Sequence, residues 1–386
     1  MTCFTFCFRK KVAYPTKQTI DIKEEVSGIQ NVIVYTYEEM RIATEDFSPA
    51  NKIGKGGFGS VYKVIGKLKD GTVVALKVLS AESRQGSREF LTEVNVISNV
   101  EHENLVKLYG CCMEGSHRIL VYGYLENNSL DQILHGGSHS SIQFSWKMRC
   151  KICTGVARGL AFLHEEVRPH IVHRDIKASN VLLDQDLTPK ISDFGLAKFF
   201  PDNQTHISTR VAGTIGYLAP EYALRGQLTR KADIYSFGVL LLEIVSGRCN
   251  TNKRLPFEEQ CLLERMWELH KQGELLAMVD MSLEGDFDDN EALRFLKIGL
   301  LCTQEMAKLR PSMSTVVKML TGEMDVDKQK ISRPGLMSDL MGLRKNKNTS
   351  DTLSGSSGKQ DNISSPENTT GSRATMTFTS IYDRSA

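Results

Sequence analysis

The sequence predicts an α+β fold in which strand-like segments come first and helical segments follow. Residues 60–68 and 72–78 have the pattern of two strands joined by an Asp-Gly turn, which is typical of a β-hairpin. Residues 87–100 then place apolar side chains at the spacing of an amphipathic helix. Residues 146–164 are also helical, and the apolar run 237–245 is expected to form a buried core helix.

The composition limits the class of protein. The chain has 386 residues, enough for one large domain with tails. With 48 Lys and Arg against 46 Asp and Glu, it gives no electrostatic reason to expect nucleic-acid binding. No apolar run reaches the roughly 18–20 residues that a membrane-spanning helix needs. The nine cysteines are odd in number and scattered, which fits a reducing compartment.

Cys150 and Cys153 have the spacing of a redox or zinc motif. No second pair of ligands lies nearby in the sequence, and both cysteines fall within the helical segment 146–164. We therefore favour cysteines that pack a helix over a metal site. Cys111 and Cys112 lie on a strand-like run and are expected in the core as well.

The octapeptide from His173 to Asn180 gathers three reactive groups on one short loop. Asp175 can accept the proton of a hydroxyl group, Lys177 can hold a phosphoryl oxygen, and Asn180 can bind Mg²⁺. This combination suits transfer of the γ-phosphoryl group of ATP to an alcohol. The hypothesis requires that the rest of the chain supply phosphate- and metal-binding groups in a matching order.

A glycine-rich loop supplies the phosphate-binding part. Its pattern, Gly-x-Gly-x-x-Gly-x-Val, lets backbone amides approach phosphate oxygens closely. A dinucleotide-binding fold uses the same glycine spacing but continues into a helix, whereas here a strand-like segment follows. The expected ATP-binding residues of this loop are Ile53, Gly54, Lys55, Gly56, Gly57, Phe58, Gly59, Ser60 and Val61.

Three charged residues complete the expected site. Lys77 is a lone cation in the apolar strand 72–78, and its position after the glycine-rich hairpin favours phosphate binding over an exposed edge residue. Glu93, on the helix 87–100, is the natural counter-ion for a partly buried Lys77. Asp193, in an Asp-Phe-Gly motif, would hold the Mg²⁺ that bridges the β- and γ-phosphates.

These motifs, followed by Ala219-Pro220-Glu221, occur in the order of eukaryotic protein kinases, which the chain resembles over roughly residues 47–322. The lysine of His-Arg-Asp-x-Lys is similar to the serine/threonine-specific branch. Segments 104–112, 120–130 and 213–222 resemble plant receptor-like kinases, a group similar to the Pelle kinases. Within that group the chain looks like a receptor-like cytoplasmic kinase of the cold-responsive protein kinase type.

The resemblance implies a two-lobed protein kinase fold. A small lobe of antiparallel strands and one main helix would cover about residues 47–121, a hinge 122–125, and a larger helical lobe 126–322. Residues 1–46 would form an N-terminal extension with a helix at its end. Residues 323–386 are expected to be disordered, because their Ser- and Thr-rich composition cannot bury enough surface to offset the ordering entropy.

The resemblance also implies the roles of single residues, with ATP and Mg²⁺ (or Mn²⁺) as cofactors. Asp175 would orient a substrate hydroxyl and accept its proton late, while Lys177 stabilises the transferred phosphoryl group. Tyr122, as the gatekeeper, and Tyr124 would line the adenine pocket. Gly123 departs from the glutamate expected in the hinge, but this position meets adenine through its carbonyl, so ATP binding should survive.

Two further charged residues are structural by the same analogy. Asp233 is expected to hold the backbone of the catalytic loop, and Arg310 is expected to pair with Glu221.

Arg174, beside the catalytic aspartate, suggests regulation. As an unpaired cation it would bind a phosphate on the activation loop and thereby order that loop. Thr205, Ser208 and Thr209 are the candidate phosphorylation sites, with Thr209 the first choice, although such hydroxyls can simply be solvated. Thr214 is a fourth candidate, and its hydroxyl is also expected to hydrogen-bond Asp175 and Lys177.

The N-terminus suggests attachment to a membrane. Cys3 and Cys7 lie among three phenylalanines and just before the cations 9–11. S-palmitoylation, with the basic cluster, would hold the chain on the inner leaflet of the plasma membrane. Residue 2 is threonine, which excludes N-myristoylation. The alternative is an unstructured end with incidental cysteines.

Protein substrates and an upstream membrane receptor kinase are the expected partners, and nucleic acid is not. A scaffold with a kinase fold but no activity is the competing class. The chain keeps the glycine loop, Lys77, Asp175 and Asp193, which such scaffolds typically lose, so we favour catalysis. A fragment of a membrane receptor is a third alternative, against which the N-terminal cysteines and cations argue.

Overall fold

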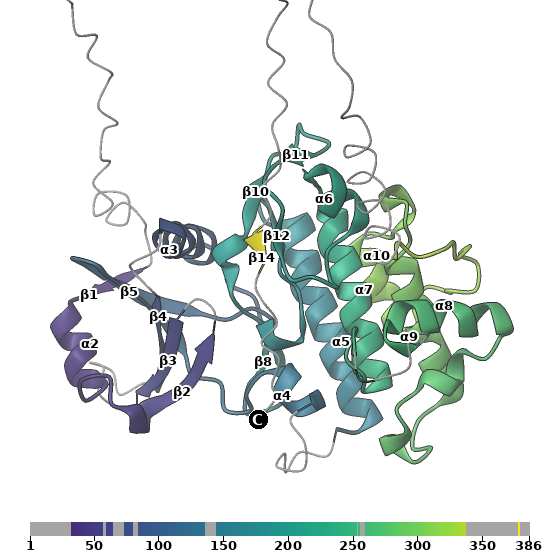
Figure 1. The fold of residues 1–386 in the computed structure, drawn as a ribbon, viewed down its shortest axis with the longest axis horizontal. Coiled ribbons are helices and arrows are strands. Elements are labelled where there is room, and N and C mark those ends of the chain that lie inside the picture. Colours follow the sequence, from purple (N-terminus) through teal and green to yellow (C-terminus); the bar gives the residue numbers. More distant parts are fainter. Residues whose placement is uncertain are drawn as a thin grey trace, which may run out of the picture.

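The computed structural model describes residues 32–56, 59–64, 73–79, 84–135, 144–252, 254, 259–336 and 377–378. Over these residues the chain forms two lobes, a sheet with two helices and a larger, mainly helical body beside it (Figure 1). The predicted α+β class and the two-lobed arrangement are confirmed.

The small lobe is built on a six-stranded sheet with the order β1-β5-β6-β4-β3-β2. Its strands are β1 (Ile33–Tyr35), β2 (Lys52–Gly56), β3 (Gly59–Val64), β4 (Val74–Leu79), β5 (Leu108–Glu114) and β6 (His117–Gly123). Strands β2 to β6 pair antiparallel, and β3 and β4 are the strands predicted around the Asp-Gly turn. Helix α3 (Arg84–Ile97) begins three residues before the predicted helix and buries Phe90 and Val94.

The end of the N-terminal extension is part of the small lobe rather than a separate segment. Strand β1 pairs parallel with β5, and helix α2 (Tyr37–Ala43) follows it. The helix begins with a capping box in which the Thr36 side chain and Glu39 exchange hydrogen bonds. Met40 is buried on the sheet, and the Tyr37 ring stacks 3.6 Å from the ring of His117. The last part of the predicted N-terminal extension therefore packs onto the small lobe.

The large lobe is a bundle of helices around one central helix. Its helices are α4 (Leu130–His135), α5 (Trp146–Ala161), α6 (Pro220–Arg225), α7 (Arg230–Ser246), α8 (Leu262–Gln272), α9 (Asp289–Cys302) and α10 (Met313–Leu320). Helix α7 is buried from Ala232 to Ser246, which confirms the core helix predicted from its apolar run. Leucine, valine and isoleucine on every side let it pack against α5, α8 and α9 at once.

Short strands connect the helices and carry the polar loops. They are β7 (His170–Val172), β8 (Val181–Leu183), β9 (Pro189–Ile191), β10 (Lys198–Phe200), β11 (Ile207–Ser208), β12 (Ala212–Gly213), β13 (Gln227–Leu228) and β14 (Thr377–Phe378). β8 pairs antiparallel with β9, and β10 with β7. The residues between β9 and α6 form the activation segment, which lies between α3 and the large lobe (Figure 1).

The predicted disorder of residues 323–386 is wrong for the first part of that segment. Residues 323–336 run along the large lobe, where Val326 and Leu336 are buried. The Tyr235 hydroxyl donates to the Gly335 carbonyl at 2.5 Å, so the backbone is anchored as well. Burial of these two apolar side chains on an existing core and the backbone anchor both contribute to ordering this stretch. Strand β14 pairs with β12, and the remainder of the tail lies outside the described residues.

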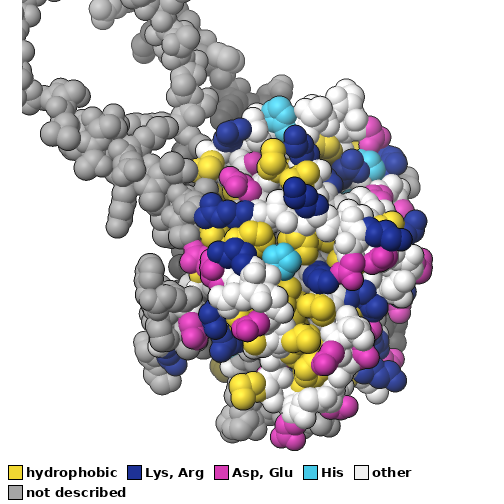
Figure 2. All heavy atoms as spheres, turned by 90° about the vertical axis from the view of Figure 1, so that its right-hand side faces the viewer, with side chains coloured by type: hydrophobic (Ala, Val, Ile, Leu, Met, Phe, Trp, Pro, Cys, Tyr) yellow, Lys and Arg dark blue, Asp and Glu magenta, His cyan; other side chains and the backbone are white. Residues whose placement is uncertain are grey.

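The cysteines of the strand and helix runs lie in packed positions, as predicted. Cys111, Cys112 and Cys153 are buried and Cys150 is half-buried, all as free thiols. Over the described ranges, no group of three or more His, Cys, Asp or Glu residues is placed to hold a metal ion. Figure 2 shows basic and acidic side chains interspersed over the exposed face of the large lobe, with no surface of one sign there.

No helix in the described part of the chain is both long and apolar enough to cross a membrane.

Candidate active site

A half-buried ion cluster joins the two lobes. Lys77 Nζ, from β4, lies 2.9 Å from Glu93 Oε2 on α3 and 2.8 Å from Asp193 Oδ1 in the loop after β9. Burial alone would lower the pKa of Lys77, but the carboxylates of Asp193 and Glu93 raise it above its usual value. Burial opposes ionisation of Asp193, yet Lys77 holds its pKa below the ordinary value. The expected Lys77–Glu93 pair is present, and these shifts keep both Lys77 and Asp193 charged.

The backbone at Asp193 is fixed by its neighbours. Asp193 is left-handed, with φ of 69°, and begins a tight turn over Phe194–Leu196. The Phe194 ring is buried, lies edge-on to the ring of His173 at 4.8 Å, and its backbone amide donates to Glu93. The Asp193 carboxylate is therefore aimed at Lys77 by its backbone and by a core aromatic residue.

Tyr122 adds a contact that the sequence did not indicate. It lies at the end of β6, is buried, and donates its hydroxyl hydrogen to Glu93 Oε1 in a very short hydrogen bond. Burial and Glu93 hold the pKa of Tyr122 well above its usual range, so the phenol is neutral. The next residue, Gly123, lies beside the ring of Tyr109, which a Cβ at that position would approach to 3.3 Å. The Lys63 ammonium lies 4.0 Å from the ring centre of Tyr124.

The catalytic-loop residues converge as expected. Asp175 Oδ2 lies 2.9 Å from Lys177 Nζ and accepts from the Asn180 amide at 3.0 Å. Asp175 Oδ1 accepts from the Thr214 hydroxyl at 2.7 Å, and the same hydroxyl accepts from Lys177 at 2.9 Å. Of its two expected roles, Thr214 is therefore positioned for hydrogen bonding, because its buried hydroxyl lies between Asp175 and Lys177.

Asp233, on α7, holds the backbone of this loop. Its carboxylate accepts from the amides of His173 and Arg174 at 2.7 and 2.8 Å, and it contacts the ring of His164 at 2.9 Å. Burial disfavours its charge, but His164 and these amides hold its pKa below the ordinary value. The fully buried carboxylate of Asp233 thereby stabilises the strained backbone of Arg174, whose φ is 74°.

Asn180 and Asp193 lie at the same end of the β8–β9 hairpin. Asn180 directly precedes β8, Asp193 follows β9 by two residues, and the Ser192 amide donates to the Asn180 carbonyl at 2.9 Å. A carboxamide oxygen and a carboxylate are oxygen donors that suit a hard divalent cation, with phosphate oxygens as further ligands. The donor set fits a nucleotide-bound metal ion.

The glycine-rich loop fits a phosphate-binding role at its described residues. Gly56 pairs with Gly59 across the β2–β3 hairpin, while Gly57 and Phe58 lie outside the described residues. Gly59 has φ of 147°, and a Cβ there would lie 1.8 Å from the Val78 carbonyl oxygen. Only glycine allows this approach of β3 to β4. Ile53 is exposed, and Val61 and Ser60 are half-buried on the strands that flank the loop.

Arg310 and Glu221 form the predicted pair. Arg310 Nη1 and Nη2 lie 2.7 and 2.9 Å from the two carboxylate oxygens of Glu221, a bidentate arrangement that anchors α6 to the large lobe. Arg310 is fully buried.

Arg174 is not the unpaired cation that we expected. Its guanidinium donates to the carbonyl oxygens of Leu196 and Arg210, each at 2.8 Å, and to the hydroxyl of Tyr222 at 3.0 Å from Nε. The backbone turns at both ends of the activation segment bring these neutral oxygens to it. Its hydrogen bonds are satisfied while its charge is not balanced by any of these partners.

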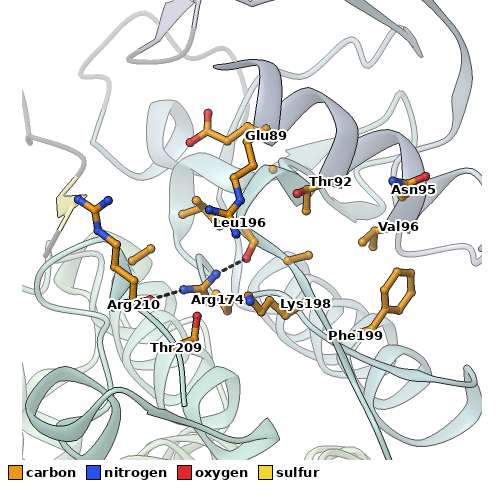
Figure 3. A pocket seen from close by; sticks show the side chains of 14 residues that line it. Glu89, Thr92, Asn95, Val96, Arg174, Leu196, Lys198, Phe199, Thr209 and Arg210 are labelled. Atoms are coloured by element: carbon orange, nitrogen blue, oxygen red, sulfur yellow. Dashed lines mark hydrogen bonds between the residues drawn. The ribbon is translucent and has the colours of Figure 1, made fainter. Parts of the chain in front are cut away.

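A cavity of about 640 Å³ opens between α3 and the activation segment, next to Arg174. Figure 3 shows Arg174 at its floor, with Lys198 and Arg210 beside it and Thr209 at the edge. Burial lowers the pKa of Lys198, and the positive charges of Arg174 and Arg88 lower it further. Of the three predicted phosphorylation sites on the activation loop, Thr209 lines this cavity, whereas Thr205 and Ser208 are exposed.

Two buried hydroxyl groups near the site escaped the sequence analysis. The Tyr217 hydroxyl donates to Glu243 at 2.5 Å, and the Tyr222 hydroxyl meets Arg174. The only available signal was that each tyrosine lies within a recognisable motif, which says nothing about the direction of its side chain. Burial raises the pKa of Glu243 to about 7, although hydrogen bonds from Tyr217 and the Asn250 amide oppose the shift.

The fold and these clusters define a phosphotransferase that uses ATP and a divalent cation. The protein kinase domain family matches residues 47–320, and the chain belongs to this family, as predicted.

Relatives in Arabidopsis thaliana show which group of protein kinases the chain resembles. The chain is 69% identical over 330 residues to Cold-responsive protein kinase 1, covering 85% of this chain and 84% of that protein. It is 54% identical over 334 residues to the probable LRR receptor-like serine/threonine-protein kinase At1g56140, covering 86% of this chain but 31% of the relative. The predicted resemblance to plant receptor-like kinases of the cold-responsive type is confirmed.

Proposed function

We propose that this kinase transfers the γ-phosphoryl group of ATP to serine and threonine hydroxyls of proteins. The observation that carries the proposal is the contact of Asp175 with Lys177 and Thr214, beside the Lys77–Asp193 ion pair. The name of the serine/threonine-protein kinase relative, which is 54% identical over the shared part, supports the same specificity.

Each residue has a defined task in this mechanism. Asp175 orients the substrate hydroxyl through Oδ1 or Oδ2 and accepts its proton as the bond to phosphorus forms. Lys177 neutralises charge on the phosphoryl oxygens, and Lys77, held by Glu93, orients the α- and β-phosphates. Asn180 and Asp193 would hold Mg²⁺, or Mn²⁺ in its place. When bound, the cation neutralises the developing charge on the β- and γ-phosphates.

The proposal is tested with recombinant protein, Mg²⁺-ATP and a generic protein substrate. Wild type should phosphorylate serine and threonine, and Asp175→Asn should be inactive although it folds. The control is Asp186→Asn, an aspartate in the exposed turn between β8 and β9, which should keep wild-type activity. Equal inactivity of wild type and Asp175→Asn would instead support a scaffold without catalytic activity.

We also propose that phosphate on Thr209 activates the enzyme. Thr209 lines the cavity that holds Arg174 and Lys198, and an anion there would balance their charge. Thr209→Ala should lower the activity of the autophosphorylated enzyme, while Ser208→Ala, the exposed neighbour, should not. Full activity of Thr209→Ala after phosphatase treatment and renewed autophosphorylation would contradict the proposal.

Attachment to the plasma membrane is proposed from the sequence of the N-terminus, which lies outside the described residues. Acyl groups on Cys3 and Cys7, with the cations 9–11, would hold the chain on the cytoplasmic leaflet, within reach of a membrane receptor kinase. Cys3→Ser with Cys7→Ser should move the protein to the soluble fraction, whereas Cys249→Ser, an exposed cysteine of the large lobe, should not. Unchanged membrane partition of the double variant would exclude acylation as the anchor.

A further inference from the structure

The hydroxyl of Tyr222 lies at the centre of a hydrogen-bonded cluster in the activation segment. Tyr222 is in the first turn of α6 and is buried. Its oxygen accepts from Arg174 Nε and Nη2 at 3.0 and 2.5 Å and from the Ala212 amide at 3.0 Å, and it donates to the Arg210 carbonyl at 3.2 Å. A hydroxyl has one hydrogen and two lone pairs, so the three donors must share the lone pairs and no capacity is left for another partner.

Through this cluster, the two ends of the activation segment are tied together. Arg174 donates to the Leu196 carbonyl, near the start of the segment, and to the Arg210 carbonyl, near its end; Figure 3 draws both bonds. Tyr222 repeats the link to Arg210 and adds Ala212. No group in this set of contacts is a phosphate or a carboxylate, so the arrangement forms with neutral oxygens alone.

The cluster is connected to the reacting groups by short backbone steps. Ala212 is followed by Gly213, whose φ is 127° and where a Cβ would lie 2.6 Å from the Arg174 carbonyl oxygen. The next residue, Thr214, donates to Asp175 and accepts from Lys177. A shift of Ala212 away from Tyr222 would therefore displace Thr214 from Asp175, and with it the place of the substrate hydroxyl.

We infer that Tyr222 is a positioning residue that holds the activation segment in its active arrangement when no phosphate is present. The inference rests on the proposed function, because it assumes that this arrangement transfers phosphate. In this view a phosphate on the activation loop and the Tyr222 hydroxyl are two partly redundant ways to hold Arg174. The phosphate supplies the negative charge that the hydroxyl lacks. The hydroxyl accepts hydrogen bonds from Arg174 whether or not the loop is phosphorylated.

The test compares wild type with Tyr222→Phe, each in an autophosphorylated and a phosphatase-treated form. The measured quantity is kcat on a peptide substrate, obtained from initial rates. Hydrogen bonds to a charged group are worth enough that unphosphorylated Tyr222→Phe should fall about 10-fold below unphosphorylated wild type. Phosphorylated Tyr222→Phe should remain within about 3-fold of phosphorylated wild type, because the phosphate then holds Arg174. An equal loss in both states, or no loss in either, would overturn the inference.

Two controls separate this role from a general loss of structure. Tyr235→Phe removes another buried hydroxyl, bonded to the Gly335 carbonyl far along the chain, and should not change the dependence on phosphate. In an Arg174→Ala background, Tyr222→Phe should cause little additional loss, since its main partner is gone; an undiminished effect there would also overturn the inference. If phosphorylated wild type were no more active than Asp175→Asn, the proposed function itself would fail instead.

Discussion

Lys77 and Arg174 are both held beside the Asp-Phe-Gly loop, but their partners are of opposite kinds. Lys77 lies between two carboxylates, those of Glu93 and Asp193. Among the residues that the structure describes, the Arg174 guanidinium donates to neutral oxygens, those of Leu196, Arg210 and Tyr222. Hydrogen bonding positions both cations, whereas charge is balanced at Lys77 alone. The first site is complete before an effector arrives, and the second can still accept an anion.

The same contrast recurs within the large lobe. Arg310 is paired bidentately with the carboxylate of Glu221, as Lys77 is paired with Glu93. Glu243 is the counterpart of Arg174, since it is a buried acid that accepts from the Tyr217 hydroxyl and the Asn250 amide. Charged partners thus fix permanent features of this enzyme, while neutral partners leave a group able to respond to a proton or an anion.

The largest effect on activity is expected from replacing Lys77, because its charge takes part in the reaction. Lys77→Met should lower kcat by about 10²–10³-fold, because one preorganised cation at the phosphates is lost. Lys107→Met is the control, since the Lys107–Glu101 pair is a surface pair with side chains 57% and 78% exposed. Steady-state kinetics with Mg²⁺-ATP decides, and a loss below about 10-fold would show that Lys77 does not act on the phosphates.

The next effect concerns stability rather than catalysis. Glu221→Gln should lower the free energy of unfolding by about 4 kcal/mol, because it leaves the buried guanidinium of Arg310 without its counter-charge. Urea denaturation measures it, with Glu101→Gln at the exposed pair as the control. If the two variants were equally stable, the distinction between buried and exposed pairs would not hold in this chain.

Glu243 should make stability depend on pH. Its folded-state pKa is raised from 4.5 to about 7, so the folded chain holds this proton more tightly than the unfolded chain does. This contribution is therefore unfavourable at high pH: it lowers the free energy of unfolding progressively between pH 4.5 and 7 and is constant above. Over this pH range, ionisation of Glu243 lowers the free energy of unfolding by about 3 kcal/mol in total.

Replacing the titrating group isolates that effect. The difference in unfolding free energy between Glu243→Gln and wild type should rise in favour of the variant from pH 5 to pH 7.5, by about 2 kcal/mol or more. Glu268→Gln, an exposed glutamate paired with Lys271, should show no such trend. A difference that stayed flat with pH would mean that Glu243 is ionised throughout.

The smallest effect on activity is expected from replacing Lys198, a cation that lines the cavity beside Arg174. Lys198→Gln should reduce the ratio of phosphorylated to unphosphorylated activity by about 5-fold. The reason is that a cation about 4 Å from a phosphate contributes roughly 1 kcal/mol in water. Lys151→Gln, whose ammonium donates to a surface carbonyl, should leave the ratio as it is. An unchanged ratio in Lys198→Gln would place the phosphate elsewhere.

Much of the active site could be predicted because its residues are close in sequence. Asp175, Lys177 and Asn180 lie within six positions, and their offsets allow few geometries once the loop is fixed. The pairing of Lys77 with Glu93 was also predictable, since a charge on an apolar strand needs a partner. Residue patterns located β3, β4 and α3 to within a few residues, whereas the apolar run 237–245 covered only the second half of α7.

Other features depended on contacts between distant residues. We predicted an unpaired Arg174, but the turns of the activation segment deliver two carbonyl oxygens and Tyr222 to it. Backbone oxygens carry no signature in the sequence, so such partners could not be anticipated. The ordering of residues 323–336 was missed for a similar reason, because Val326 and Leu336 find a surface that other segments create.

By itself, then, the sequence determined the class of enzyme and the groups that perform the reaction, because the chemistry requires particular side chains at short, fixed offsets. Only the tertiary structure decided the partners of Arg174 and brought Asp193 to Lys77 as a second carboxylate. Whether a cation meets carboxylates, as Lys77 does, or neutral oxygens, as Arg174 does, depends on the packing of residues that lie 16 to 116 positions apart in the sequence. That packing also brought Tyr222 to Arg174 and left the neighbouring cavity positively charged.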